Sequence, residues 1–151
     1  MQTLSRFPLA AASIVMMGCA GLFNTFTAAE VGRVPLTAPG TASTTAVVAA
    51  GPVALWTDLD VSWDGDAALA YDVQVSQDGA VIAQLRCDPL DVNVTMNSMT
   101  SDFGGSHSRR YQGLMHCDVT APVDGMIEVT ASLSVLSGAP TLELADLVLK
   151  Q

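Results

Sequence analysis

Hydrophobic and polar residues alternate along most of the chain after residue 51. Between Val53 and Trp63 the odd-numbered positions are mostly large and apolar, whereas the even-numbered positions are mostly small or acidic. A period of two residues is typical of a strand that buries one face. The alternation returns in later segments, at 69–76, 81–87, 90–96, 110–119, 126–135 and 141–149.

Turn-forming residues lie between these segments. Asp78-Gly79 is a strong signal for a two-residue hairpin, because glycine adopts the positive φ that such turns need. Residues 97–108 are rich in Asn, Ser, Asp, Gly and His and predict the longest loop. No segment after the leader combines a 3.6-residue stripe with helix caps. The sequence therefore predicts an all-β domain over residues 51–151, an antiparallel β-sandwich of about seven strands.

The first fifty residues have a different composition. Residues 1–29 begin with one basic residue, Arg6, followed by an apolar run from Phe7 to Gly18, which is the pattern of a secretory signal. Residues 30–50 mix Pro, Gly and Thr with small residues and show no sustained period, so we interpret them as a flexible tether. The protein is therefore predicted to be exported, to the cell envelope or beyond it.

The end of the leader suggests how the protein is attached. Met16-Met17-Gly18-Cys19 resembles a bacterial lipobox, which implies that Cys19 becomes the lipidated first residue and holds the domain at a membrane. One alternative is a conventional cut after Ala29, which would release a soluble secreted domain. Another is an uncleaved anchor over residues 7–29, which is just long enough to span a bilayer.

Cysteine usage agrees with export. If Cys19 belongs to the leader, Cys87 and Cys117 remain as a pair, and exported domains normally oxidise such pairs. The register places both on the apolar faces of their strands. Zinc sites usually take four ligands at paired spacings, and the chain has no Cys-x-x-Cys. We therefore predict a disulfide between Cys87 and Cys117.

The charge of the chain restricts its partners. The net charge is −9, and it becomes −10 if Arg6 is lost with the leader, because five basic residues then face fifteen acidic ones. Proteins that bind nucleic acid normally carry a basic patch or stripe, which this acidic chain lacks. Nucleic acid is therefore excluded as a partner, whereas cations and neutral ligands such as glycans remain compatible.

One tryptophan is a candidate for ligand binding. The register that buries Trp63 points Trp56 outward beside Asp58 and Asp60. A ring that stacks on a sugar, next to carboxylates that accept hydroxyl hydrogen bonds, is a common design in sugar-binding sheets. The alternative is that both faces of this strand are covered. Further candidate contacts for a glycan or protein partner follow the long loop, at Arg109, Arg110 and Tyr111.

Four carboxylates lie close together in the sequence, and Ca²⁺ binds oxygen ligands of this kind. They make Ca²⁺ the one candidate cofactor. The alternative is that the first two line the solvent side of a strand and that the last two form a turn around Gly65. The residues are Asp58, Asp60, Asp64 and Asp66.

The sequence favours binding over catalysis. Ser106-His107-Ser108 contains a nucleophile and a base, but neighbours on an extended chain point apart, and the chain has no Gly-x-Ser-x-Gly motif. We therefore expect a binding or structural module and not an enzyme. A Ca²⁺-assisted or carbohydrate-binding module is the first alternative, and a secreted hydrolase is the second.

Overall fold

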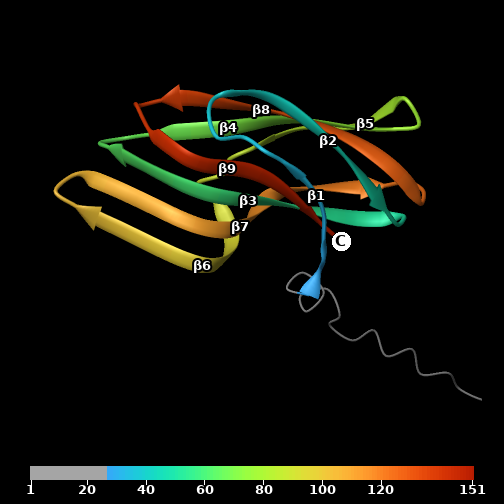
Figure 1. Ribbon diagram of the computed structural model, residues 1–151, viewed down its shortest axis with the longest axis horizontal. Helices are drawn as coiled ribbons and strands as arrows, with labels where there is room; N and C mark the ends of the chain where they lie inside the picture. The colour runs from blue at the N-terminus through green and yellow to red at the C-terminus, as the bar shows by residue number, and fades with distance from the viewer. Residues whose placement is uncertain (1–26) are drawn as a thin grey trace, which may run out of the picture.

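The computed structural model describes residues 27–151. Segments in which apolar and polar residues alternate form nine strands in this part of the chain (Figure 1). Short turns join them, and every pairing is antiparallel. Their bounds are β1 Glu30–Val34, β2 Gly40–Val48, β3 Gly51–Asp64, β4 Ala68–Gln77, β5 Ala80–Cys87, β6 Val92–Phe103, β7 Ser106–Ala121, β8 Gly125–Ser137 and β9 Thr141–Lys150.

The strands divide between two sheets that pack face to face (Figure 1). Sheet A has the order β1-β9-β3-β7-β6, and sheet B has the order β2-β8-β4-β5. The predicted antiparallel β-sandwich is therefore confirmed, with nine strands in place of about seven. The last stretch, 141–149, is indeed a strand, and β9 lies inside sheet A between β1 and β3.

The core lies between the sheets, where alternating apolar rows meet. Leu55 and Leu59 of β3 and Leu147 of β9 belong to the same buried cluster as Val73 of β4 and Ile127 of β8. Burying a side chain of this size stabilises the fold by about 1.5–3 kcal/mol. The period of two thus places one row of each strand in the core and the other row outside.

A hydrogen bond crosses the core from one sheet to the other. The Tyr71 hydroxyl, on β4, donates to the Ala145 carbonyl of β9 at 2.7 Å and lies 3.0 Å from the Thr57 hydroxyl of β3. Both side chains are fully buried, and the bonds satisfy polar groups that would otherwise be costly to bury. Burial raises the pKa of Tyr71.

The prediction of a flexible tether over residues 30–50 is wrong, because this segment forms β1 and β2. β1 pairs with β9 at the edge of sheet A, and β2 pairs with β8 at the edge of sheet B. The inward positions of β2 include small residues such as Ala42, Thr44 and Ala46, so its alternation is weak in sequence. Thr and Val nevertheless favour strands. The folded domain therefore begins near residue 30.

The prediction of a long loop over residues 97–108 is also wrong, because these residues form the end of a β-hairpin. β6 continues to Phe103 and β7 begins at Ser106, joined by Gly104 and Gly105. Both glycines have positive φ, 58° and 85°, which allows the tight turn. The residues here are polar because the hairpin is largely exposed. Solvation, and not the lack of a strand, thus explains the polar composition.

Two predicted links are present. Asp78 and Gly79 join β4 to β5 with φ values of 52° and 78°, as a two-residue hairpin turn requires. Cys87 of β5 and Cys117 of β7 form a disulfide that joins sheet B to sheet A, with their Cα atoms 5.9 Å apart. Closing a loop of this length stabilises the fold by about 3–4 kcal/mol in the chain-entropy model.

The leader with Cys19 lies mostly outside the described residues, which begin at residue 27. Within residues 27–151, no helix is long and apolar enough to cross a bilayer. The Ala29 and Gln151 backbones exchange two hydrogen bonds of 3.0 Å, so the two ends of the described chain meet beside β1 and β9 (Figure 1).

Candidate functional site

Sheet A extends past the core at β6. Sheet A has five strands over the four of sheet B, and β6 is its last strand. Thr95 and Thr100 lie in the same cross-strand rows as the core-facing residues Thr57 and Val61, yet both are exposed. The inner face of the sheet therefore changes from apolar to hydroxyl-bearing as it reaches β6.

Trp63 marks this change. It ends the core-facing row of β3 and is half-buried, packed against the core but not enclosed by it. Beside it lies a groove of about 400 Å³. The lining comes from β3, from the β5–β6 connection, and from β6 and β7: Trp63, Leu90, Val92, Thr95, Ser98, Thr100, Arg109 and Tyr111.

Two polar side chains lie against the Trp63 ring, and a carboxylate pairs with both of them. The His107 ring stacks on it, with centroids 5.3 Å apart, and the Arg109 guanidinium carbon lies 5.5 Å from its centroid. Asp102 of β6 accepts two hydrogen bonds from Arg109, at 2.8 and 3.1 Å, and also pairs with His107 Nδ1. The hydrogen bonds from Arg109 lower the pKa of Asp102, so this carboxylate stays ionised in mild acid.

Tyr111 links two elements that line the groove. Tyr111 is buried, and its hydroxyl donates to the Pro89 carbonyl at 2.8 Å, which ties β7 to the β5–β6 connection. Burial raises the pKa of Tyr111 to about 12. The disulfide at Cys87 lies two residues before Pro89 and fixes the same connection. The groove therefore combines an aromatic ring with hydroxyls on walls that are held by covalent and hydrogen bonds.

The structure moves the aromatic candidate from Trp56 to Trp63. Trp56 does lie on the outer face of sheet A, but only 1% of it is exposed, so the interpretation as an accessible ring is wrong and the alternative, that both faces of this strand are covered, is confirmed. Trp56 lies on β3, between Val148 of β9 and Leu114 of β7. The Lys150 ammonium lies over the ring, 4.1 Å from its centroid. Burial lowers the pKa of Lys150.

The acidic residues near Trp56 are held by basic partners. Asp58 accepts hydrogen bonds from Arg33 at 2.9 Å and from Gln112 at 3.3 Å, and Asp60 lies 3.6 Å from Arg110. Asp60 and Arg110 also line a hollow of about 280 Å³ on the outer face of sheet A. Arg110 is therefore separated by the sheet from Arg109 and Tyr111, its neighbours in sequence.

The four candidate calcium ligands are not brought together. Asp64 accepts a hydrogen bond from Ser106 at the end of β3, and Asp66 is exposed in the following turn. Among the described residues, no three His, Cys, Asp or Glu side chains are arranged to hold a metal ion. Calcium binding at these residues stays a prediction of the sequence.

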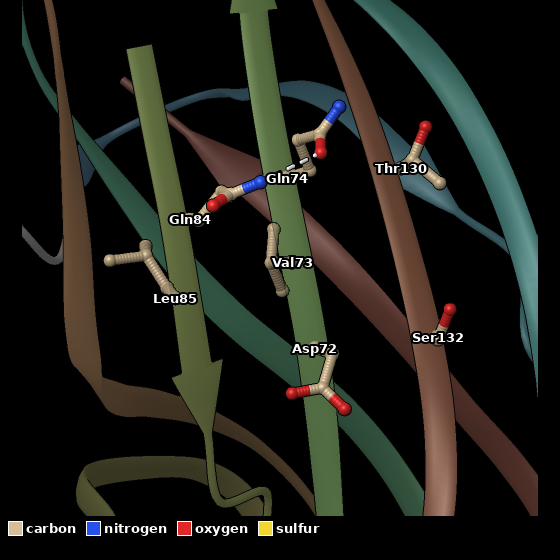
Figure 2. A pocket seen from close by; sticks show the side chains of 7 residues that line it. All are labelled: Asp72, Val73, Gln74, Gln84, Leu85, Thr130 and Ser132. Atoms are coloured by element: carbon tan, nitrogen blue, oxygen red, sulfur yellow. Dashed lines mark hydrogen bonds between the residues drawn. The ribbon is translucent and has the colours of Figure 1, made fainter. Parts of the chain in front are cut away.

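The outer face of sheet B carries a hollow of about 510 Å³ (Figure 2). It has no aromatic lining, and its polar side chains already have hydrogen-bond partners. Figure 2 shows Gln84 donating to Gln74 at 3.0 Å. Asp72 pairs with Arg86, and Thr130 and Ser132 bond to hydroxyls of β2. Its lining residues are Asp72, Val73, Gln74, Gln84, Leu85, Thr130 and Ser132.

Comparison with known proteins adds no relative. No model of a known protein family matches the chain, and no curated protein matches it. The geometry of the grooves is therefore the basis for assigning a site. Trp63 lines the Trp63 groove and also a smaller hollow of about 270 Å³ beside Ser106 and His107, whereas the hollows at Arg110 and at Asp72 have no tryptophan.

Proposed function

We propose that this protein is an exported binding module and that its ligand site is the groove beside Trp63. The observation that carries the proposal is the position of Trp63, a half-buried ring at the margin of the core that borders a groove of about 400 Å³. Ligand sites typically combine an apolar or aromatic surface with a few fixed polar groups in a concave region. This groove has both.

The lining favours a carbohydrate as ligand. A sugar ring presents an apolar face that stacks on an aromatic ring, and its edge carries hydroxyl groups that need hydrogen-bond partners. Beside Trp63, the row of Thr95, Ser98 and Thr100 offers hydroxyls that both donate and accept. Arg109 offers donors, but its charge is already neutralised by Asp102. A neutral oligosaccharide therefore fits this groove better than an anionic ligand.

Export and attachment are part of the proposal. The leader of residues 1–29 supports export, the likeness of Met16-Met17-Gly18-Cys19 to a lipobox supports a lipid anchor at Cys19, and the Cys87–Cys117 disulfide agrees with an oxidising compartment. An anchored module of this kind would bind its glycan at the cell envelope.

Replacing Trp63 tests the site. We expect the wild-type protein to bind members of an array of neutral oligosaccharides, and Trp63→Ala to weaken that binding by roughly tenfold or more, because the stacking surface is lost. Titration calorimetry with the best oligosaccharide of the array measures the change in affinity.

Phe103→Ala is the matched control. Phe103 is an aromatic residue of the same hairpin and is 87% exposed, but it does not line the groove. It should leave the affinity unchanged. Full binding by Trp63→Ala, an equal loss in Phe103→Ala, or no binding of any array member by the wild-type protein contradicts the proposed function.

A further inference from the structure

The sandwich has four edge strands, β1 and β6 in sheet A and β2 and β5 in sheet B. An edge strand presents unpaired N–H and C=O groups that can pair with a strand of another chain. Natural proteins prevent this with short strands, charged residues, proline or bulges at the edge. The four edges can therefore be compared for these features.

Three of the edges are protected. β1 is five residues long, carries Arg33, and pairs irregularly between Glu30 and Gly32. β5 carries Arg86, and its pairing with β4 shifts once. β6 pairs with β7 through two irregularities, and its Asn97 has a φ of 54°. Each of these features disturbs the regular row of backbone groups that a new strand would need.

The β2 edge has none of these features. Its nine residues, Gly40–Val48, contain no charged residue and no proline. They pair with β8 in one unbroken register, from Gly40 opposite Leu133 to Val48 opposite Gly125. Within residues 27–151, β2 pairs with β8 alone, so its other side has no strand partner. β2 is therefore a template of regular register for an incoming strand.

The surface around β2 narrows the choice of partner. Val47 is 74% exposed, and its cross-strand neighbour Met126 is 59% exposed, which gives the edge an apolar end. The outward residues before it are hydroxyl-bearing. The whole chain has a net charge of −9, so two copies repel each other through most of their surfaces. Because β2 carries no charge, two acidic copies can meet at this edge without bringing like charges of that strand together.

We propose that two copies of this protein associate by pairing β2 antiparallel to β2 about a two-fold axis. Each copy then contributes the same strand to the interface, as a closed two-fold dimer requires. Pairing centred near Thr44 sets Ser43 opposite Thr45 and Ala42 opposite Ala46, which matches hydroxyl with hydroxyl and small with small. The two copies of sheet B become one continuous sheet, and the Trp63 groove, on the other sheet, stays free.

A charge on the edge tests this pairing. Thr45 points outward from β2 beside Glu128 of β8, so a lysine there is tolerated in one copy and gains an ion-pair partner. In the dimer, Thr45→Lys brings two ammonium groups close together across the two-fold axis. We expect sedimentation velocity of the full chain to show a wild-type dimer whose dissociation constant rises by roughly tenfold or more in Thr45→Lys.

Ser76→Lys is the matched control, because Ser76 lies beside the same Glu128 on β4, inside sheet B. It adds the same charge away from the edge and should leave the dimer intact. Amide exchange over β2 should also slow as the wild-type concentration rises. A wild-type protein that is monomeric at every concentration, or oligomers that Thr45→Lys leaves unchanged, would overturn the proposal.

Discussion

At the scale of single residues, the two tryptophans of β3 have different roles. Trp56 is 1% exposed on the outer face of sheet A, where Val148 and Leu114 flank it and Lys150 lies over its ring. Trp63 is half-buried at the margin of the core and borders the groove. The first ring stabilises the sheet, and the second is available to a ligand.

We expect Trp56→Ala to lower the free energy of unfolding by about 3–5 kcal/mol, because it removes a large buried ring. Trp56→Phe should cost much less, since the indole nitrogen of Trp56 has no hydrogen-bond partner to lose. Urea denaturation followed by circular dichroism measures both. Equal stability of Trp56→Ala and the wild-type protein would refute the structural role.

The sequence predicted only part of the candidate site. Alternation placed Trp56 and Trp63 correctly on opposite faces of one strand, but it could not show which face was covered. Val148 and Lys150 of β9, more than ninety residues away, help to bury Trp56. The four strands of sheet B leave the inner face of β6 exposed, so Trp63 borders open space. Arg109 and Tyr111 were identified as contacts, while Thr95, Ser98 and Thr100 gave no signal.

At the scale of elements, ion pairs of one basic residue add to the backbone pairing that joins β1 to sheet A. Asp58 of β3 and Asp146 of β9 lie directly opposite each other, an arrangement that is destabilising for two carboxylates without a cation. Arg33 of β1 donates to both, at 2.9 and 3.0 Å, and pairs with Glu30 as well. Asp146 also accepts the Leu36 backbone N–H. Arg33 therefore reduces the repulsion between the two carboxylates and links β1 to β3 and β9.

We expect Arg33→Met to lower the free energy of unfolding at neutral pH by about 1–3 kcal/mol, since it leaves the facing carboxylates without their cation. The control is Arg86→Met, whose ion pair with Asp72 is well exposed and should contribute little. Urea unfolding of both variants gives the comparison. A larger loss in Arg86→Met than in Arg33→Met would contradict this role.

The same network has a pH dependence whose sign follows from Glu30. The hydrogen bond from Arg33 lowers the pKa of Glu30 from its usual value of 4.5. The contribution of Glu30 to the free energy of unfolding is therefore complete above pH 4.5, and it is lost as the pH falls through the lowered pKa of Glu30 in the folded protein. The stability difference between wild type and Arg33→Met should accordingly narrow in acid. A difference that widens below pH 4.5 would contradict this assignment.

The sequence predicted the fold class but not the full set of strands. Strands with large apolar residues on one face, such as β3, were evident because their period of two is strong. β2 was missed because its inward residues are small, and Pro35 and Pro39 suggested a tether although they lie between strands. β6 and β7 were predicted at 90–96 and 110–119, but their continuation through residues 97–108 was missed because those residues are polar. In each case the neighbouring strands supply what the local sequence does not show.

At the scale of the whole molecule, the first strand limits the distance between a lipid anchor and the domain. β1 begins at Glu30, so a chain lipidated at Cys19 has only residues 20–29 as its connection. Such a segment spans at most about 35 Å when fully extended. The domain of such a chain would therefore lie close to the membrane surface.

A leader cut that leaves Ala29 in the protein, such as processing at Cys19, preserves a contact between the ends of the described chain. Ala29 and Gln151 exchange two backbone hydrogen bonds, and a chain beginning at Glu30 would lack both. We expect the protein to be recovered with the membrane fraction of its producing cell, with an intact mass equal to the chain from Cys19 plus a lipid adduct. Cys19→Ser should abolish the adduct. A lipid-free chain beginning at Glu30 in the soluble fraction would instead establish a free secreted domain, with the groove and the disulfide unchanged.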